Sequence, residues 1–206
     1  MHAVHSESDQ GGTMASDPVQ HVKNYLREAQ RRGIPEHNAI ALATTGEGEI
    51  PNVRIVLLKD IRDGQFVFYT NYTSVKAMEI LSGNGAAFVI FWARMQVQIR
   101  VRGTVETVES RVSDAYFESR SLLSRYGAIA SPQSQVIRTR DDLLDRVEAV
   151  AGKYGDKPPR PPHWGGYRIL PLAIEIWQAG EGRLHTRNRW SRPDADSPWE
   201  SVLLAP

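Results

Sequence analysis

Residues 39–71 read AIALATTGEGEIPNVRIVLLKDIRDGQFVFYTN, and this stretch decides the fold. Short runs rich in Val, Ile, Phe and Tyr alternate in it with Gly-containing turns, a pattern typical of β-strands in tight hairpins. The predicted strands and turns are, in order, Ala39 to Thr45, Gly46-Glu-Gly48, Asn52 to Lys59, Asp63-Gly64 and Gln65 to Asn71. Strands joined this closely pair antiparallel, so the stretch favours a barrel or sandwich over a doubly wound parallel sheet.

The strand pattern resumes further along the chain, with helices between the runs. The other predicted strands are Ala86 to Trp92, Val97 to Val108, Tyr167 to Leu170, Ala173 to Gln178, Arg183 to Trp190 and Trp199 to Leu204. Helices are predicted from the cap Asp17 to Gly33, after Ser74, from about Arg111 to Arg120, and from Thr139 to Tyr154, the last with Leu143, Leu144, Val147 and Val150 inward. Residues 1–16 lack an apolar period and are expected to be a disordered tail, which leaves one mainly β domain with peripheral helices over residues 17–206.

The composition limits the classes of function. Of the 206 residues, 41% are hydrophobic and 24% charged, and the formal net charge is +1, which gives no general attraction to nucleic acid or to a membrane. The absence of cysteine excludes disulfides, thiolate metal sites and thiol nucleophiles. No run approaches the roughly 18 apolar residues of a membrane span, and the N-terminus does not look like a secretory signal. We therefore expect a cytoplasmic protein without a metal site, in which any basic function is local.

Arg183, His185 and Arg187 stand at two-residue spacing in the segment WQAGEGRLHTR of residues 177–187. In an extended strand, all three side chains leave the same face. Two guanidiniums and an imidazole on one face repel one another and lose solvation, so such a row suits an anionic or electron-rich ligand. The alternative is an edge strand whose charges simply face water.

Two segments earlier in the chain could bind a phosphate. In RIVLLK, residues 54–59, Arg54 and Lys59 lie at the two ends of a strand and are expected on opposite faces. In YTNYTSVK, residues 69–76, a strand end leads through a polar turn into a helix start, where free N–H groups and Lys76 favour an anion. Either segment could equally be solvated surface. The chain has no GxGxxG or Walker pattern, which argues against dinucleotide and nucleoside triphosphate folds.

A third group lies in YFESRSLLS, residues 116–124. Tyr116, Arg120 and Ser124 follow one another at four-residue spacing, so they are expected on one helical face, where two hydroxyls and a guanidinium can surround a phosphate. Gln98 and Gln133 carry amides that can pair with the edge of a heterocycle. Taken singly, a surface arginine beside a tyrosine and two exposed glutamines explain these residues as well.

Six blocks in a fixed order give these segments a common meaning: RIVLLK at 54–59, YTNYTSVK at 69–76, GAIASPQS at 127–134, PPHWGGY at 161–167, IEIWQ through RLHTR at 174–187, and LAP at 204–206. With them the chain from Asp17 to Pro206 resembles the pyridoxine/pyridoxamine 5′-phosphate oxidase family of FMN enzymes. The resemblance implies an FMN-binding split barrel, an antiparallel Greek-key barrel, that forms a homodimer with two FMN molecules at the subunit interface.

The resemblance also implies roles for the matching residues. The FMN phosphate would be held by Arg54, Thr70, Lys76 and Ser134, and the flavin would lie against the segment Arg54, Ile55, Val56, Leu57 and Lys59, with Tyr69 also on the cofactor side. The remaining cofactor contacts, some of them from the partner subunit, would be Gln98, Gln133, Trp177 and Arg187. The substrate phosphate would be bound by Lys59, Tyr116, Arg120 and Ser124, and the substrate ring would lie beside the catalytic pair Arg183 and His185.

The implied activity is the oxidation of pyridoxine 5′-phosphate or pyridoxamine 5′-phosphate to pyridoxal 5′-phosphate. FMN accepts the hydride, and dioxygen reoxidises the flavin and becomes hydrogen peroxide. In this reading Arg183 and His185 position the substrate ring, and Arg187 stabilises negative charge on reduced flavin.

Three departures from the family pattern keep other activities open. A family basic residue is here Val75, a family PRxS segment after the substrate arginine is here Ser121-Leu-Leu-Ser124, and the family's N-terminal RxxY segment has no counterpart in residues 1–16. A more open site would suit the alternative, an FMN oxidase of phenazine biosynthesis that acts on a reduced tricyclic intermediate. Retention of the four substrate-phosphate residues favours the vitamin B6 reaction. The complete row of Arg183, His185 and Arg187 argues against a non-catalytic flavin or haem carrier.

Overall fold

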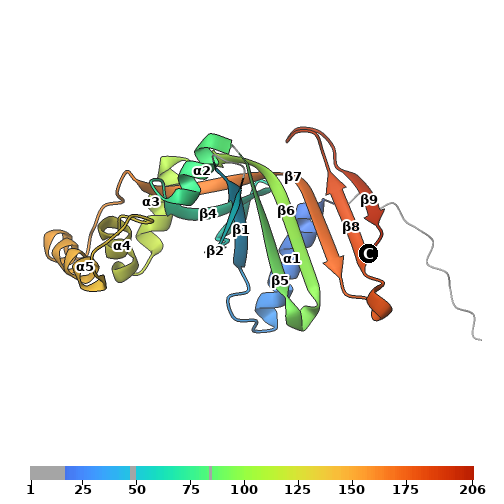
Figure 1. Ribbon diagram of the computed structural model, residues 1–206, viewed down its shortest axis with the longest axis horizontal. Helices are drawn as coiled ribbons and strands as arrows, with labels where there is room; N and C mark the ends of the chain where they lie inside the picture. The colour runs from blue at the N-terminus through green and yellow to red at the C-terminus, as the bar shows by residue number, and fades with distance from the viewer. Residues whose placement is uncertain (1–16, 47–49, 84) are drawn as a thin grey trace, which may run out of the picture.

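The computed structural model describes residues 17–46, 50–83 and 85–206, and its frame is a curled antiparallel sheet (Figure 1). The strands are β1 (Ala39–Thr45), β2 (Pro51–Leu57), β3 (Asp60–Arg62), β4 (Gln65–Asn71), β5 (Gly85–Trp92), β6 (Val97–Thr107), β7 (Trp164–Gln178), β8 (Thr186–Ser191) and β9 (Glu200–Leu204). Their order is β2-β1-β5-β6-β7-β4-β3, with β8 added to β7 and β9 to β8. The predicted class, mainly β and antiparallel with peripheral helices, is confirmed. The predicted tail at residues 1–16 and the centre of the turn after Gly46 lie outside the described residues.

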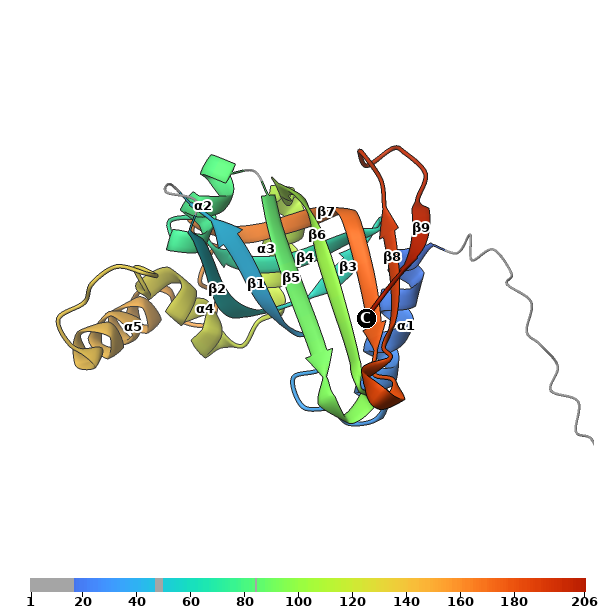
Figure 2. The ribbon, with the colours of Figure 1, turned by 45° about the vertical axis from the view of Figure 1, so that its right-hand side comes forward.

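Strand β7 connects the curled part of the sheet to a flatter extension (Figure 2). Its first half pairs with β4 and its second half with β8, while β6 follows it on the other side. The β6–β7 register shifts between Arg102 and Gly103, and a Cβ atom on Gly103 would lie 1.9 Å from the carbonyl oxygen of Leu170. Only glycine fits this irregularity. Because the strand continues past it, the two strands predicted over residues 167–170 and 173–178 are one strand.

The barrel is open between β2 and β3, which form its two edges. Within the described residues β2 pairs only with β1, and β3 only with β4. The connector between them is held by Leu58 N–H, which donates to Asn38 O at 2.8 Å, and by Lys59 N–H, which donates to Val67 O at 2.8 Å. Strand β2 therefore ends at Leu57, earlier than predicted, and its outer edge stays available for a ligand.

The predicted turn at Asp63-Gly64 is confirmed. Both residues have positive φ values, 50° and 77°, as a tight two-residue hairpin requires. The turn joins β4 to the short strand β3, which was not predicted because three residues are too few for a periodic signal.

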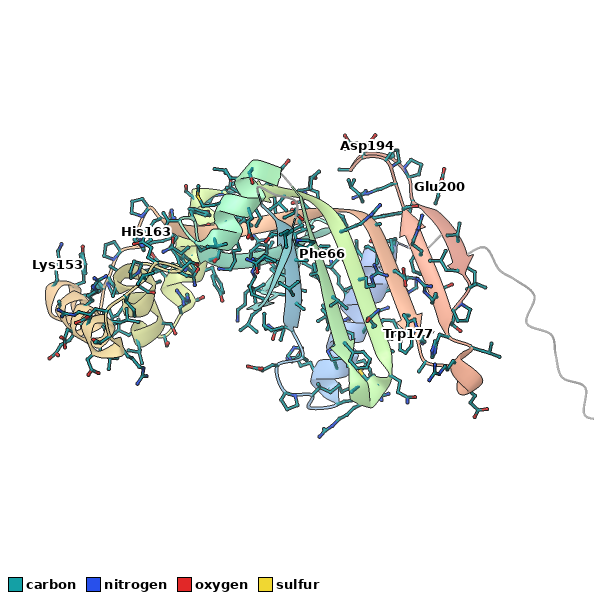
Figure 3. The ribbon with its side chains drawn as sticks, in the orientation of Figure 1. Phe66, Lys153, His163, Trp177, Asp194 and Glu200 are labelled. Atoms are coloured by element: carbon teal, nitrogen blue, oxygen red, sulfur yellow. The ribbon has the colours of Figure 1, made fainter. Side chains whose placement is uncertain are left out.

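The core lies inside the curl. Phe66 and Phe88 meet edge to face there with ring centroids 5.2 Å apart, and Figure 3 labels Phe66 at the centre of the curl. Helix α1 (Pro18–Arg31) packs Val19 and Val22 against this core. Asp17 caps the helix as predicted, since its Oδ1 accepts from Val19 N–H at 3.0 Å.

The other helices are α2 (Val75–Gly83), α3 (Ser110–Ser119), α4 (Leu122–Ala130) and α5 (Arg140–Tyr154). Helices α4 and α5 pack on each other and project from the barrel as an arm (Figures 1 and 2). Thr139 caps α5 through a capping box with Asp142. The prediction that this helix turns its apolar residues into the core is wrong: no α5 residue is buried, and Leu144 is 48% exposed. Helix α5 packs on α4 rather than on the barrel.

Candidate active site

A cavity of about 800 Å³ opens at the split of the barrel, between β2, β4, α3, α4 and the start of α2. Twelve of the predicted site residues line it: Arg54, Ile55, Val56, Leu57, Lys59, Tyr69, Thr70, Lys76, Tyr116, Arg120, Ser124 and Gln133. Arg54 and Lys59 were expected on opposite faces of one strand. Both line the cavity, because β2 ends at Leu57 and Lys59 belongs to the connector.

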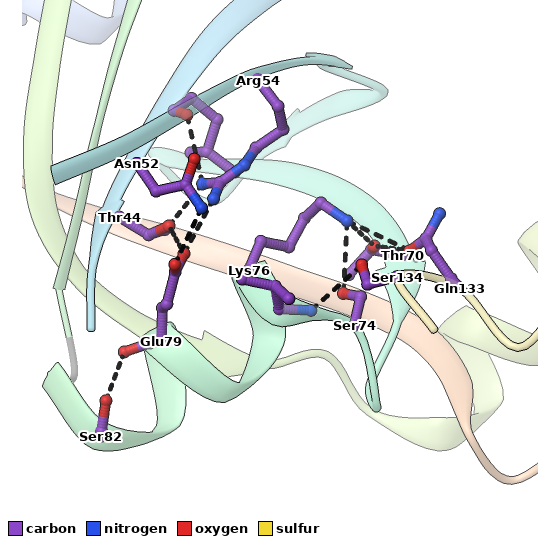
Figure 4. A network of polar contacts seen from close by, with 12 residues as sticks. Thr44, Asn52, Arg54, Thr70, Ser74, Lys76, Glu79, Ser82, Gln133 and Ser134 are labelled. Atoms are coloured by element: carbon purple, nitrogen blue, oxygen red, sulfur yellow. Dashed lines mark hydrogen bonds and ion pairs between the residues drawn. The ribbon is translucent and has the colours of Figure 1, made fainter. Parts of the chain in front are cut away.

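Lys76 forms the cationic end of the cavity (Figure 4). The residue is only 9% exposed, and its Nζ donates to Thr70 Oγ1 at 3.2 Å, Ser74 Oγ at 3.2 Å and Gln133 Oε1 at 3.1 Å. All three partners are neutral. Desolvation by burial, and after it the positive charge of Arg54, lowers the pKa of Lys76, while Glu79 acts weakly in the opposite direction. A buried ammonium without a directly paired carboxylate favours an anion beside it.

Ser134 lies at the same helix start. Its Oγ accepts from Val75 N–H at 3.3 Å, so the hydroxyl stands over the first turn of α2 beside Lys76 (Figure 4). The helix dipole at this end also favours a negative charge. Ser134 has a φ of 72°, which places it in the left-handed region. The residue predicted for the phosphate group is therefore next to Lys76, although it does not itself line the cavity.

Arg54 is held beside Lys76 by a carboxylate that the sequence did not single out. Its Nη2 donates to Glu79 Oε2 at 2.8 Å, and its Nη1 donates to Thr44 Oγ1 (Figure 4). Asn52 Nδ2 donates to Glu79 Oε1 at 3.0 Å, and the Arg54 and Glu79 side chains are 19% and 13% exposed. The signal that could have found Glu79 is its place on α2 three residues after Lys76, on the same side of the helix.

Part of the cavity wall is aromatic. Tyr69 and Tyr116 stack with ring centroids 3.9 Å apart, and Trp164 continues the stack 5.5 Å from Tyr69. Arg120 lies over the Trp164 ring, with its Cζ 4.7 Å from the ring centroid. Trp164 was quoted only as part of a family block, although a tryptophan followed by two glycines at a strand start is itself a signal of close packing.

The prediction that Tyr116, Arg120 and Ser124 share one helical face is wrong. Helix α3 ends at Ser119, Arg120 has an extended backbone (φ −75°, ψ 152°), and a separate helix, α4, starts at Leu122. Ser121 caps α4 and donates to Ser124 Oγ at 2.8 Å. The three side chains nevertheless line one cavity, because the break between the two helices turns both toward it.

The remaining predicted residues lie elsewhere in the chain. Gln98 is paired with Trp177 and Trp177 with Arg187, so the three form a row across β6, β7 and β8 on one face of the sheet. None of the three lines the 800 Å³ cavity. Figure 3 shows Trp177 at the far end of β7 from His163 and the arm.

Arg183, His185 and Arg187 do not form the single-faced row that their spacing suggested. Arg183 belongs to the short 3-10 turn η2 (Glu181–Arg183) with a φ of 65°, and β8 begins only at Thr186. His185 accepts from Gly180 N–H at Nδ1 at 3.2 Å, and its ring lies 4.6 Å from that of Trp177. Arg187 pairs with the buried Glu175 at 3.0 Å. Because the turn η2 is not extended, the two-residue spacing does not place Arg183, His185 and Arg187 on a common face.

The described part of the chain contains no group of three or more His, Asp or Glu residues placed to hold a metal ion. It also contains no helix that is long and apolar enough to span a membrane.

Known proteins resemble this chain along almost its whole length. A family model described as pyridoxamine 5′-phosphate oxidase matches residues 26–154, and one described as pyridoxine 5′-phosphate oxidase C-terminal dimerisation region matches residues 164–206. A pyridoxine/pyridoxamine 5′-phosphate oxidase of Cereibacter sphaeroides is 48% identical over 199 residues, which cover 96% of this chain and all of the relative.

Solved structures agree with the sequence relatives. The crystal structure of PhzG from Burkholderia lata 383, in complex with tetrahydrophenazine-1-carboxylic acid, is 28% identical, with a TM-score of 0.87 over 98% of this chain and all of that one. A pyridoxamine 5′-phosphate oxidase-related, FMN binding protein from Nostoc punctiforme shares the fold, with 18% identity and a TM-score of 0.76 over 92% of this chain and 98% of that one. From the two family models and the relatives at this level of identity, the chain belongs to the pyridoxine/pyridoxamine 5′-phosphate oxidase family.

Proposed function

We propose that this protein is an FMN-dependent oxidase that converts pyridoxine 5′-phosphate or pyridoxamine 5′-phosphate to pyridoxal 5′-phosphate and reduces dioxygen to hydrogen peroxide. The observation that carries the proposal is that cations from different elements line one cavity: Arg54 of β2 with Lys76 of α2, and Arg120 between α3 and α4. A cofactor phosphate and a substrate phosphate require two such positions. Relatives 45–48% identical bear the name of this activity.

The residues at the Lys76 end fit the phosphate of FMN. The ammonium is buried among neutral oxygens of Thr70, Ser74 and Gln133, which leaves its charge to be matched by a ligand. The free edge of β2 offers backbone N–H and C=O groups along the same cavity, suited to the polar edge of a flavin ring.

At the other end of the cavity, Arg120, Tyr116, Ser124 and Lys59 would bind the phosphate of the substrate. Once that group is fixed, the substrate ring can be oriented with its reacting carbon toward the flavin, and orientation of this kind supplies much of the rate enhancement in hydride transfer. FMN, when bound, supplies a hydride acceptor that dioxygen can reoxidise. His185, whose Nδ1 is occupied by Gly180 N–H, presents Nε2 for contact with the ring or for holding a proton.

Completion of the site calls for a second copy of the chain. Residues that pair across the sheet point to the same face, which places Val53 and Ile55 of β2 and Phe91 of β5 on the face that also carries the Gln98, Trp177 and Arg187 row. Val53, Ile55 and Phe91 are 59%, 65% and 58% exposed. An apolar area next to a row that contains Trp177 and Arg187 is the composition expected of a face that another subunit covers. In the proposed homodimer, Trp177, Arg183, His185 and Arg187 of one subunit complete the cavity of the other.

Ile55→Asp tests the dimer. A buried, unpaired carboxylate at the interface should convert dimers to monomers in sedimentation analysis and reduce the FMN content of the purified protein. Leu144→Asp, at a comparably exposed leucine on α5, is the control and should remain dimeric. A dimeric, fully loaded Ile55→Asp variant would contradict the proposed interface.

A second candidate function is the oxidation of a reduced tricyclic acid. It is favoured by the high structural similarity to PhzG and by the segment Ser121-Leu-Leu-Ser124, where apolar side chains replace a charge of the family pattern and Leu123 is 70% exposed. Oxygen uptake with pyridoxine 5′-phosphate, pyridoxamine 5′-phosphate and a reduced phenazine precursor separates the two. Turnover of the B6 phosphates with an absorbance spectrum of bound flavin supports the first proposal, whereas turnover of the precursor alone supports the second. A protein that is colourless and does not bind added FMN would refute both.

A further inference from the structure

Trp164 is the residue on which the guanidinium of Arg120 rests. The first residue of β7, it is 6% exposed, and its backbone is paired with Asn71 of β4. Its carbonyl oxygen accepts from Arg160 Nη1 at 2.6 Å, and Arg160 in turn pairs with Asp114 of α3 at 2.6 Å. The backbone of Trp164 is therefore fixed to the barrel and, through Arg160, to α3.

The plane of the indole is fixed by other aromatic rings. Trp164 is nearly parallel to Tyr69 and Tyr116, at interplanar angles of 11° and 7°, and Phe117 meets it edge-on with centroids 5.3 Å apart. These contacts leave the ring little rotational freedom. The face that it offers to Arg120 is consequently rigid.

Arg120 has no other strong partner within the described residues. It follows the last residue of α3, no carboxylate pairs with it, and its Nη1 is buried without a hydrogen bond. Burial lowers the pKa of Arg120, with Tyr116 acting weakly in the opposite direction. A guanidinium that is desolvated, lies on a fixed ring and has a free N–H edge is prepared for a planar, bidentate contact with a phosphate.

We propose that Trp164 is a positioning residue that acts through Arg120: it holds the guanidinium face-on so that the N–H edge is already aimed at the substrate phosphate. The inference rests on the proposed function, because it assigns the phosphate of the substrate to Arg120. Binding then requires little additional ordering of the arginine side chain, which is the usual benefit of preorganisation. The effect belongs to phosphate binding and not to the hydride-transfer step.

The test compares Trp164→Leu and Trp164→Phe in the FMN-loaded enzyme. Trp164→Leu removes the ring face and should raise KM for pyridoxine 5′-phosphate about tenfold, which corresponds to about 1.4 kcal/mol, with kcat within about twofold of the unchanged enzyme. Trp164→Phe keeps an aromatic face and should restore most of the loss. Trp199→Leu is the matched control, since Trp199 also lies under an arginine, Arg192, with its ring centroid 4.3 Å from that Cζ, and it should leave KM unchanged.

A double-mutant cycle shows whether Trp164 acts through Arg120. In an Arg120→Ala background, Trp164→Leu should cause no further rise in KM, because the group that it positions is gone. Multiplicative effects of the two substitutions, or a fall in kcat with unchanged KM, would overturn the proposal. Flavin content and thermal unfolding of each variant show whether Trp164→Leu acts by disrupting the fold. In that case Trp164→Phe decides the question: a KM close to that of the unchanged enzyme supports the proposal, and an approximately tenfold rise in KM overturns it.

Equilibrium binding separates this inference from the proposed reaction. Inorganic phosphate, titrated into FMN-loaded protein by calorimetry, should bind about tenfold more weakly to Trp164→Leu than to the unchanged protein. If neither B6 phosphate is oxidised but this weakening is found, the reaction is wrong and the positioning role stands. If the B6 phosphates are oxidised and phosphate binds equally to both proteins, the positioning role is wrong and the reaction stands.

Discussion

Lys76→Met should have opposite effects on FMN binding and on the stability of the flavin-free protein. Lys76 is 9% exposed and donates only to neutral oxygens, so the folded protein has already desolvated the ammonium before any ligand arrives. Coulomb's law with an effective dielectric constant of about 20 gives about 5.5 kcal/mol for two unit charges about 3 Å apart. Allowing for the contacts that Arg54 and the helix start still make, about 3 kcal/mol should be lost, so Kd for FMN should rise about 100-fold or more.

The flavin-free variant should be about 1 kcal/mol more stable than the unchanged protein at neutral pH. Methionine fills similar space without a buried charge. Because burial lowers the pKa of Lys76, the unfolded chain holds its proton to a higher pH than the folded one. The unchanged protein should therefore gain stability as pH rises from the lowered pKa of Lys76 toward the ordinary pKa of lysine. Over this pH range, the difference in free energy of unfolding between the two proteins should disappear.

Two measurements check this pair of effects. FMN affinity is measured by titrating flavin-free protein and following the change in flavin fluorescence, and stability by urea unfolding at several alkaline pH values. Lys157→Met, at an exposed lysine after α5, is the control and should change neither quantity. A Kd within about threefold of the unchanged protein would refute the assignment of Lys76 to the cofactor phosphate. A clear loss of stability in the flavin-free variant would refute the argument that its buried charge is uncompensated.

Two further predictions concern residues behind the site. Burial alone would raise the pKa of Glu79, but hydrogen bonds from Thr44, Asn52 and Arg54 lower it overall. Glu79→Gln should therefore reduce the free energy of unfolding by about 1–2 kcal/mol at neutral pH, and urea titrations should show this loss disappear as pH falls through the lowered pKa. A loss that does not depend on pH would contradict the prediction. A Cβ atom on Gly180 would lie 2.0 Å from Leu184 O. Gly180→Ala should shift the turn that holds His185 and lower kcat about 10- to 100-fold in oxygen-uptake assays while FMN stays bound; an unchanged kcat would argue against a role for this turn.

Local patterns in the sequence predicted the regular elements well. The β-branched and aromatic runs of β1, β4, β5 and β6 were found within about a residue, because each is bounded by Gly, Pro or polar turn residues. The Asp17 cap and the Asp63-Gly64 turn were correct for the same reason, since side-chain chemistry within four residues determines both. Helix α5 was placed correctly but oriented incorrectly, because periodicity shows that a helix has an apolar side and not what covers it.

The candidate site was predicted in its membership and only partly in its arrangement. Lys76, Arg120 and Tyr116 do meet in one cavity. Arg120, however, reaches it from a break between two helices, and the spacing that suggested one helical face carries no signal for such a break. Arg183 shows the same limit, because a short turn with a left-handed residue takes the place of the first residues of the strand that the alternation had suggested, and β8 begins only at Thr186.

The sequence by itself determined the antiparallel class of this protein, most strand and helix positions and, through six ordered blocks, its family. These follow from the conformational preferences of short segments and from the order of residues along the chain, and neither requires a structure. Tertiary structure alone decided that Glu79 holds Arg54 and that Trp164 lies beneath Arg120. It also decided that the row of Gln98, Trp177 and Arg187 does not line the cavity of its own chain. Each of these depends on side chains brought together from elements far apart in the sequence, and no local pattern encodes which face of one element will meet which face of another.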